Sequence, residues 1–416
     1  MKALVNEAPG LPIDRSRKDH ASSWNFKEKI LLGLSVRDYL AQMMRNPVNW
    51  VLAAILLLGI PLLGQRYLFG LASVTHGSQD YPWGLLLGFG LFAMVPLSAS
   101  GFLLSTTVEI FHRKDFLPIE RLALLNGLLG YFFAVVYLLV DLGMPWRLTY
   151  PMVVSFGPAA VLFLVAWHVA TYLSVQIAEM VPAFAEWAGW PAAKRWIKSI
   201  ALGLTIAGII LSTLHQGALG ALFTYAPAKI HPLWISTEFQ WLHFFCSSIF
   251  AGLCMVIIVS TLLKHFMTWR CDTRFLDNLD RITIGLAKGS AYAMITYLVI
   301  KLVAIAHDQE WQYLITGWGA YYLLELGIGV ILPMVLFARG VRNHNVPILR
   351  FGAVIAVLGI IWNRLNTVMV AYNWQHYQEL PTWQETWIVF TVLAFYFIIY
   401  RFILYRLPVV FTWKQA

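Results

Sequence analysis

Four polar side chains are spaced so that they would share one face of a single helix. They follow one another at intervals of four, four and three residues, and they are His168, Tyr172, Gln176 and Glu179. Such spacing is the repeat of one helix face, and the row would span about 16 Å at 1.5 Å per residue. Groups that bind and release protons at these intervals predict a proton relay. Hydrogen bonding between packed helices is the alternative for any one of them.

A second polar row on an earlier apolar segment extends this hypothesis. It consists of Ser98, Ser105 and Glu109. Together the two rows can lead protons from one membrane surface towards Asp141, which lies at the opposite end of its own apolar segment. We therefore predict that Glu109 belongs to the relay and that Asp141 is an acid–base group at the end of it.

The stretch from Ser212 to Trp234 ends one long apolar segment and leads directly into the next. His215 and Gln216 lie where that segment should meet the membrane surface, and a loop containing His231 follows after several small residues. A polar pair at the membrane edge, covered by an ordered loop, suits the polar head of an amphiphile. A capped helix end with interfacial anchors is the alternative.

The second half of the chain carries charged residues inside apolar segments, and these must be paired or functional because a charge in lipid is costly. They are Lys288, Lys301, Glu325 and Arg364. Glu325 and Arg364 each lie about eight residues from the same end of their segments, so we predict a structural ion pair between them.

The elements that position these residues are membrane-spanning helices. The chain has 416 residues, of which 59% are hydrophobic and 12% charged, and a bilayer is crossed by about 20 apolar residues in a helix. We predict an all-α polytopic membrane protein with an interfacial helix over Lys27–Arg45 after a polar N-terminal arm. The ten predicted spans are Val48–Leu68, Pro82–Glu109, Ile119–Leu142, Ser155–Val181, Trp196–Phe223, Thr237–Thr261, Ile282–Ala306, Gly317–Ala338, Ile348–Val370 and Trp383–Leu404.

Charge asymmetry predicts the orientation. With both termini in the cytoplasm, 24 of the 30 Lys and Arg residues fall on the cytoplasmic side, as the positive-inside rule requires. The net charge of +9 is thus a topology signal and does not indicate nucleic-acid binding. The opposite loops are rich in Trp, Tyr, Pro and His, which is typical of membrane interfaces and also of a surface covered by another protein.

Redox centres are not indicated by the sequence itself. The three cysteines, Cys246, Cys254 and Cys271, have neither CxxC nor Cys/His ligand spacing, so we expect no metal ion and no iron–sulfur cluster in this chain. His215 and His243 both fall near one membrane surface, but a matched pair of haem ligands at equal depth on neighbouring helices is not evident. We therefore expect no haem.

Three short motifs resemble those of a known family. Ser212–Phe223, written STLHQGALGALF, is similar to the Leu-His-Gln element of the NrfD/polysulfide-reductase membrane subunits, and Pro232-Leu233-Trp234 and Asn363-Arg364-Leu365-Asn366 match further elements. The resemblance extends over essentially the whole chain. One departure is that Gly217-Ala218 follows Gln216 where many relatives have two serines.

The resemblance implies a quinone-binding membrane anchor without a redox centre of its own, which exchanges electrons between an extracytoplasmic iron–sulfur subunit and menaquinone. Molybdopterin-type and multihaem cytochrome subunits are the further implied partners, in the bacterial inner membrane. It assigns the quinone site to Asp141, His168, His215 and Gln216, with catalysis by Asp141 and His215. The proton relay would then comprise Glu109, His168, Tyr172, Gln176 and Glu179.

The resemblance also implies two four-helix bundles flanked by the first and last helices. The expected division is an arm and interfacial helix (1–46), a first flanking helix and loop (47–81), a first bundle holding the quinone site (82–236), a second bundle (237–382) and a last helix with its tail (383–416). A secondary transporter, which would require broken helices around a central cavity, and a purely structural anchor are the competing functions.

Overall fold

The computed structural model describes residues 25–78, 80–376 and 380–411, and it confirms the all-α polytopic fold. Ten helices of the described part are long and apolar enough to cross a membrane. They are α3 (Pro47–Phe69), a composite span over Leu85–Ile110, α7 (Leu117–Asp141), α9 (Val161–Ala188), α10 (Pro191–Ala221), α11 (Gln240–Phe266), α12 (Thr273–His307), a composite span over Gly317–Arg342, α16 (Val346–Leu365) with a π turn to Val370, and α17 (Trp383–Arg406).

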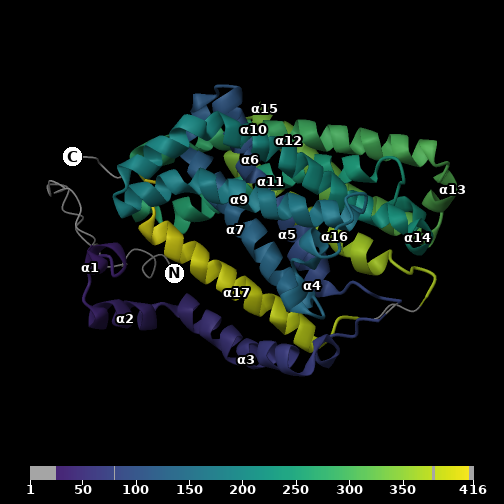
Figure 1. Cartoon of the computed structure of the whole chain (residues 1–416). Helices are drawn as coiled ribbons and strands as arrows, with labels where there is room; N and C mark the ends of the chain where they lie inside the picture. Colours follow the sequence, from purple (N-terminus) through teal and green to yellow (C-terminus); the bar gives the residue numbers. More distant parts are fainter. Residues whose placement is uncertain (1–24, 79, 377–379, 412–416) are drawn as a thin grey trace.

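The spans run between two different surfaces. We call the surface with α1 (Phe26–Lys29), α2 (Val36–Arg45) and the end of α17 the basic side. The aromatic side is the surface with α13 (Trp311–Leu314) and the loop residues 70–78, 80–84, 226–236, 371–376 and 380–382 (Figure 1). An antiparallel bridge between Ile230 and Tyr372 joins two of these aromatic-side loops. Both candidate pockets described below open on this side.

The interfacial segment differs from the prediction of one helix over Lys27–Arg45. It forms two short helices, because Leu32 and Gly33 adopt positive φ angles of 55° and 83° and break the helix between them. Arg406 of α17 then fixes the break: its Nη2 donates to the Ile30 carbonyl at 2.6 Å and to the Tyr39 hydroxyl at 2.9 Å. The arm is thereby attached to the last span.

Burial separates central spans from peripheral ones. The most apolar window of the Leu85–Ile110 span is 89% buried, whereas that of α3 is only 17% buried. α3 packs against α17 at the edge of the molecule, and α11 contacts both α10 and the composite second span (Figure 1). The second span therefore lies at the centre of the protein and α3 faces lipid.

Three predicted boundaries differ from the structure by six residues or more: both ends of the fourth span, which ends at Ala188 instead of Val181, and the start of the seventh. The fourth span begins at Val161 instead of Ser155, since Gly157 and Pro158 precede it in irregular backbone. The seventh begins at Thr273 instead of Ile282, with Asp272 accepting a hydrogen bond from the Phe275 amide at 2.7 Å. Hydropathy reports only the apolar part of a helix, so charged turns beyond the bilayer are missed.

Wide helical turns interrupt the spans near several polar residues. They have π geometry and cover Gly88–Ala93, Thr106–Ile110, Gly327–Ile331 and Asn366–Val370. A π turn inserts one residue into an α-helix and reorients the side chains around it, often at functional sites. Glu109 and Asn366 both lie in such turns.

Candidate functional site

A pocket on the aromatic side brings two carboxyl groups together, and we call it the Asp141 pocket. It encloses about 520 Å³, including the part that is open to solvent. Its walls come from the loop after α3, the end of α7 and the start of α17. They include Leu71, Thr75, His76, Tyr81, Trp83, Asp141, Met369, Leu380 and Glu385. The apolar side chains form walls around a small number of polar groups, as in sites for small amphiphilic ligands.

A buried arginine fixes the helix end that carries Asp141. Arg66 of α3 is 1% exposed. Its Nε donates to the Val140 carbonyl at 2.5 Å, and its Nη2 donates to the Leu142 carbonyl. The last carbonyls of a helix lack partners within the helix and carry partial negative charge, so a cation there is stabilising. These bonds hold Asp141, the last residue of α7, at the pocket wall.

The second carboxyl group belongs to Glu385 in the first turn of α17. It accepts a hydrogen bond from the Leu86 amide at 3.1 Å, and it is 3% exposed. A Cβ atom at Gly84 would lie 2.3 Å from Glu385 Oε1, so a larger residue here would displace this carboxyl group. The close approach places Glu385 against the start of the second span and next to Asp141 in one cavity.

A second assembly of polar side chains, some buried and some half-buried, lies between α7, α9 and α10, and we call it the polar string. Its members are His215, Gln216, Tyr131, His168, Tyr172, Gln176 and Glu179. Gln216 Nε2 donates to the Tyr131 hydroxyl at 3.3 Å and to the Val95 carbonyl at 3.2 Å. The ring of Tyr131 lies 5.5 Å from that of His215 and 4.7 Å from that of Tyr172. Tyr131 therefore joins α10 to α9.

The four predicted residues of α9 do share one face, which is directed into the protein. The ring of Tyr172 contacts Tyr131 of α7 on one side, and Gly208 of α10 also lies against the ring of Tyr172. Gln176 is completely buried. A Cβ atom at Gly127 of α7 would lie 2.7 Å from Gln176 Nε2, so glycine makes room for this amide.

Carboxyl groups continue the polar string towards the basic side. The Glu179 carboxyl lies beside Ser105 of the second span. Glu120 in the first turn of α7 interacts electrostatically with both Glu179 and Glu109. Glu109 is exposed at the end of the second span. The polar string thus reaches the surface through three acidic side chains.

Several buried atoms of the polar string have no hydrogen-bond partner among the described residues. They are His168 Nδ1, the Tyr172 hydroxyl, both amide atoms of Gln176, Glu179 Oε2 and both ring nitrogens of His215. Each unpaired buried polar group costs about 1–3 kcal/mol. A row of such groups is therefore poorly explained by packing alone and suits a path for water and protons.

The structure does not place Asp141 and His215 in one cavity. Asp141 lines its pocket, whereas His215 is completely buried in the polar string. Trp83, which lines the pocket, packs in an aromatic cluster that we call the aromatic wall: its ring is 5.1 Å from Phe223, which follows α10, and 5.9 Å from Phe92, measured between ring centroids. The predicted site residues thus form two separate groups.

The predicted ion pair between Glu325 and Arg364 is wrong in its direct form. No salt bridge joins them within the described residues. Asn363 lies between them, since its Nδ2 donates to Glu325 Oε1 at 2.6 Å and its Oδ1 accepts from Arg364 Nη1 at 2.7 Å. Each charged group also has a neutral partner: Trp234 Nε1 donates to Glu325 at 2.8 Å, and Arg364 donates to Ser247 at 2.5 Å. The Nε of Arg364 has no hydrogen-bond partner among the described residues.

The loop histidine His231 is part of an aromatic cluster. The rings of Trp374, Trp318, Trp234 and Tyr313 all lie within 5.4 Å of its ring. Its Nδ1 accepts a hydrogen bond from the Leu233 amide at 3.3 Å. Burial lowers the pKa of His231 to about 4, so the ring is neutral at physiological pH and stabilises the loop.

Three residues of these assemblies were not predicted from the sequence. Tyr131 is one aromatic residue among many in apolar segments, and only its contacts reveal its position. Arg66 lies near the end of the predicted first span and was given no role, but it is buried in α3 with 1% of its surface exposed. Glu385 follows the helix cap Thr382, whose hydroxyl accepts from the Glu385 amide at 2.9 Å, and it therefore resembles an ordinary first-turn carboxylate.

Comparison with known proteins agrees with this architecture. The sequence profile described as Polysulphide reductase, NrfD, matches residues 73–376. The chain is 40% identical over 369 residues to a protein of Nitratidesulfovibrio vulgaris Hildenborough, covering 88% of this chain and 95% of that one.

Two further relatives have more informative names. The probable Ni/Fe-hydrogenase 2 b-type cytochrome subunit of Escherichia coli K12 is 27% identical over 362 residues, covering 85% of this chain and 90% of the relative. The menaquinone reductase integral membrane subunit of Nitratidesulfovibrio vulgaris is 25% identical over 355 residues, covering 74% and 79%. From the extent of the profile match, this chain belongs to the polysulphide reductase NrfD family of integral membrane proteins.

Proposed function

We propose that this chain is the quinone-binding membrane subunit of a respiratory oxidoreductase complex. In this proposal it exchanges electrons between an iron–sulfur partner on the aromatic side and menaquinone in the Asp141 pocket. The observation that carries the proposal is the meeting of two carboxyl groups with an apolar wall at a membrane edge. The names of two relatives, one from a menaquinone reductase and one from a hydrogenase, support it.

The residues of the Asp141 pocket fit a quinone in chemical type. Trp83, Leu71 and Met369 offer apolar and aromatic surface for a ring and the start of an isoprenoid tail. Asp141 and Glu385 offer polar atoms for the head group. A quinone accepts two electrons and two protons when it becomes quinol, so its site needs groups that deliver protons.

Each part of the site has a distinct role in this proposal. Asp141 and Glu385 bind and orient the head group, and Arg66 holds Asp141 in place. The polar string brings protons from the basic side, entering at Glu109 and ending at His215 and Gln216. Trp83 and Phe223 must move for the last transfer across the aromatic wall.

The orientation follows from the charge asymmetry. The basic side faces the cytoplasm of a bacterial inner membrane, and the aromatic side faces the electron-donating or electron-accepting partners. An iron–sulfur subunit covers the aromatic side, with molybdopterin-type and multihaem cytochrome subunits further out. Protons taken from inside and electrons exchanged outside would make turnover electrogenic.

The proposal is tested with Asp141→Asn and His215→Ala in the intact complex, with Glu238→Gln as the control. Glu238 is an exposed carboxyl group on the aromatic side that does not line the Asp141 pocket. We expect Asp141→Asn to raise the KM for a soluble menaquinone analogue, and His215→Ala to lower kcat at least tenfold, since acid–base groups contribute about 10²–10⁴-fold. Unchanged quinone kinetics in both variants would refute the proposal.

A further inference from the structure

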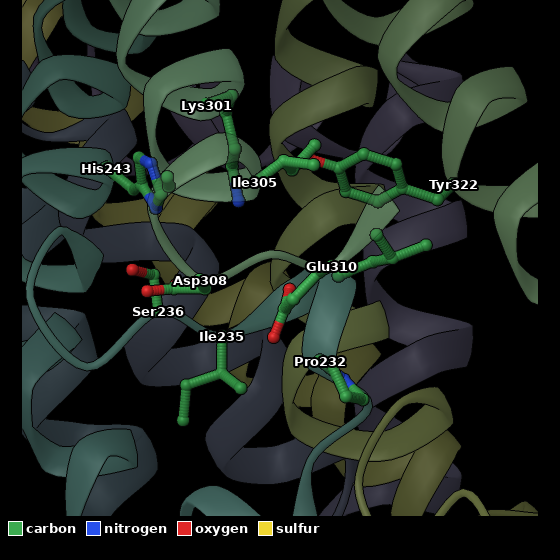
Figure 2. A pocket seen from close by; sticks show the side chains of 11 residues that line it. Pro232, Ile235, Ser236, His243, Lys301, Ile305, Asp308, Glu310 and Tyr322 are labelled. Carbon is green, nitrogen blue, oxygen red and sulfur yellow. The ribbon is translucent and has the colours of Figure 1, made fainter. Parts of the chain in front are cut away.

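A second pocket on the aromatic side lies at the mouth of the other half of the protein, and we call it the Lys301 pocket. It is formed by the loop before α11, by α11 and α12, and by the turn that follows α12. Its polar lining residues are Ser236, His243, Lys301, Asp308, Glu310 and Tyr322 (Figure 2). It shares no lining residue with the Asp141 pocket. Nothing in the quinone proposal uses it.

The inner part of the Lys301 pocket contains polar groups that lack partners. Lys301 is only 4% exposed, and its ammonium group lies 5.8 Å from the ring centroids of both Tyr297 and Tyr322. None of the ion pairs found among the described residues involves Lys301. His243 is 2% exposed, its Nδ1 lies 3.4 Å from Gln240 Oε1, and its ring lies near the backbone of Ile300. The Tyr322 hydroxyl has no hydrogen-bond partner in the described structure. Burying a polar or charged side chain without a hydrogen-bond or ion-pair partner costs free energy, so such side chains inside a membrane protein indicate a functional site.

The outer part of the Lys301 pocket is acidic. Asp308 and Glu310 lie on the turn between α12 and α13, and in the view of Figure 2 their carboxyl groups line the pocket below His243 and Lys301. Burial and the neighbouring Asp308 raise the pKa of Glu310 to about 7, while Lys301 opposes the shift. Glu310 therefore binds its proton more readily than an ordinary exposed carboxyl group.

The mixture of charges decides which ligand the Lys301 pocket suits. An anion would be attracted by Lys301 but repelled by Asp308 and Glu310. A metal cation would be attracted by Asp308 and Glu310 but repelled by Lys301. A proton needs only neighbouring groups that can each bind and release it, and acids at the surface with bases below provide that.

We propose that the Lys301 pocket is a proton port, through which His243 and Lys301 exchange protons with the solution on the aromatic side by way of Asp308 and Glu310. No covalent or redox step is involved, because one proton moves between solution and protein. The charged or titratable groups that face Lys301 are His243 from α11, Tyr297 from α12, Glu325 and Tyr322 from α14 (Gly317–Leu326), Arg364 from α16, and Asp308 and Glu310 from the turn.

The port gives the second half of the protein a proton-exchanging site that faces away from the basic side. The polar string of the first half faces the basic side. The two halves then communicate with opposite surfaces, and this arrangement is independent of whether a quinone binds in the Asp141 pocket.

The first experiment measures access from the aromatic side with a positively charged, membrane-impermeant thiosulfonate reagent. Ile305 lines the Lys301 pocket and is 4% exposed, whereas Val299 of the same helix is 52% exposed on an apolar surface. We expect Ile305→Cys in the reconstituted full chain to react within tenfold of Thr237→Cys, an exposed loop position. Val299→Cys should not react because lipid covers it. The unmodified chain provides the blank for the native cysteines.

Failure of Ile305→Cys to react, with Thr237→Cys reacting normally, would overturn the port. So would equal reaction of Ile305→Cys and Val299→Cys, since that would indicate general permeability and no pocket.

The second experiment follows the protonated carboxyl band by infrared spectroscopy as the pH changes. Glu310→Gln should remove one carboxyl group that titrates near pH 7, and the control Glu238→Gln should leave that band unchanged. Lys301→Met should shift the titration to higher pH, because the nearby ammonium group opposes protonation of Glu310. An unaltered band in Glu310→Gln refutes the proposal. If Lys301→Met does not fold, the thiol reaction and Glu310→Gln still decide it.

Discussion

Substitution of Gln176 distinguishes between two roles of the polar string, a proton path and structural packing. Its side chain is completely buried, and neither amide atom has a hydrogen-bond partner among the described residues. We therefore consider Gln176→Leu, which keeps the volume similar and removes the amide. A residue that held helices together by hydrogen bonds would lose stability on this change, but Gln176 makes no well-formed hydrogen bond among the described residues and has only a looser polar contact with Tyr172 of its own helix.

The magnitude follows from the cost of an unpaired buried amide, which is about 1–3 kcal/mol. Gln176→Leu should consequently leave the free energy of unfolding unchanged or raise it within that range. Because Gln176 belongs to the polar string, the substitution should nevertheless slow proton delivery, and turnover in proteoliposomes should fall at least tenfold. Stability would increase while activity is lost.

Asn126 is the matched control, because it is a buried amide in the same part of the protein with satisfied bonds. Its Nδ2 donates to the Leu97 carbonyl at 3.1 Å and to Ser100 at 2.9 Å, and its Oδ1 accepts from Tyr396 at 3.4 Å. Asn126→Leu should lower the unfolding temperature and leave turnover per folded molecule unchanged. On one preparation, thermal unfolding gives the unfolding temperature. An assay in proteoliposomes gives the turnover together with the membrane potential generated per electron. A Gln176→Leu protein that is less stable and fully active would refute the polar string as a proton path.

Three further predictions concern other parts of the chain. The purified chain should show no Soret absorbance, because His215 and His243 lie in separate polar surroundings beside Tyr131 and Tyr297; a stoichiometric b-type spectrum would contradict this. Asn363→Leu should lower stability by about 1.5–3 kcal/mol for each hydrogen bond to a charged group that is lost, since Asn363 bonds both Glu325 and Arg364, and equal melting of variant and wild type would contradict its bridging role. The pKa of Glu310 is raised to about 7 in the folded chain, so ionisation of its carboxyl group opposes folding. The stability of the wild type relative to Glu310→Gln should therefore fall between pH 4.5 and pH 7 and stay constant above pH 7. Melting experiments at several pH values measure this difference.

The number, length and order of the membrane-spanning helices could be predicted from the sequence because hydrophobicity and charge act locally. A helix in lipid must satisfy its own backbone hydrogen bonds, so each span is encoded in its own segment. The row on α9 was predictable for the same reason, since helical spacing alone places His168, Tyr172 and Gln176 on one face. The break at Leu32 and Gly33 was not, because it depends on backbone angles and on contacts with α17.

Which polar residues meet across helices was decided only by the tertiary structure. Equal depth suggested that Glu325 and Arg364 would pair directly, but depth does not fix rotation about the helix axis, and Asn363 occupies the space between them. Asp141 and His215 likewise both lie near a membrane surface, yet Asp141 lines its pocket and His215 is buried in the polar string. Rotation and packing at helix crossings depend on side chains distant in sequence, such as Gly127 against Gln176, and a local pattern contains no information about them.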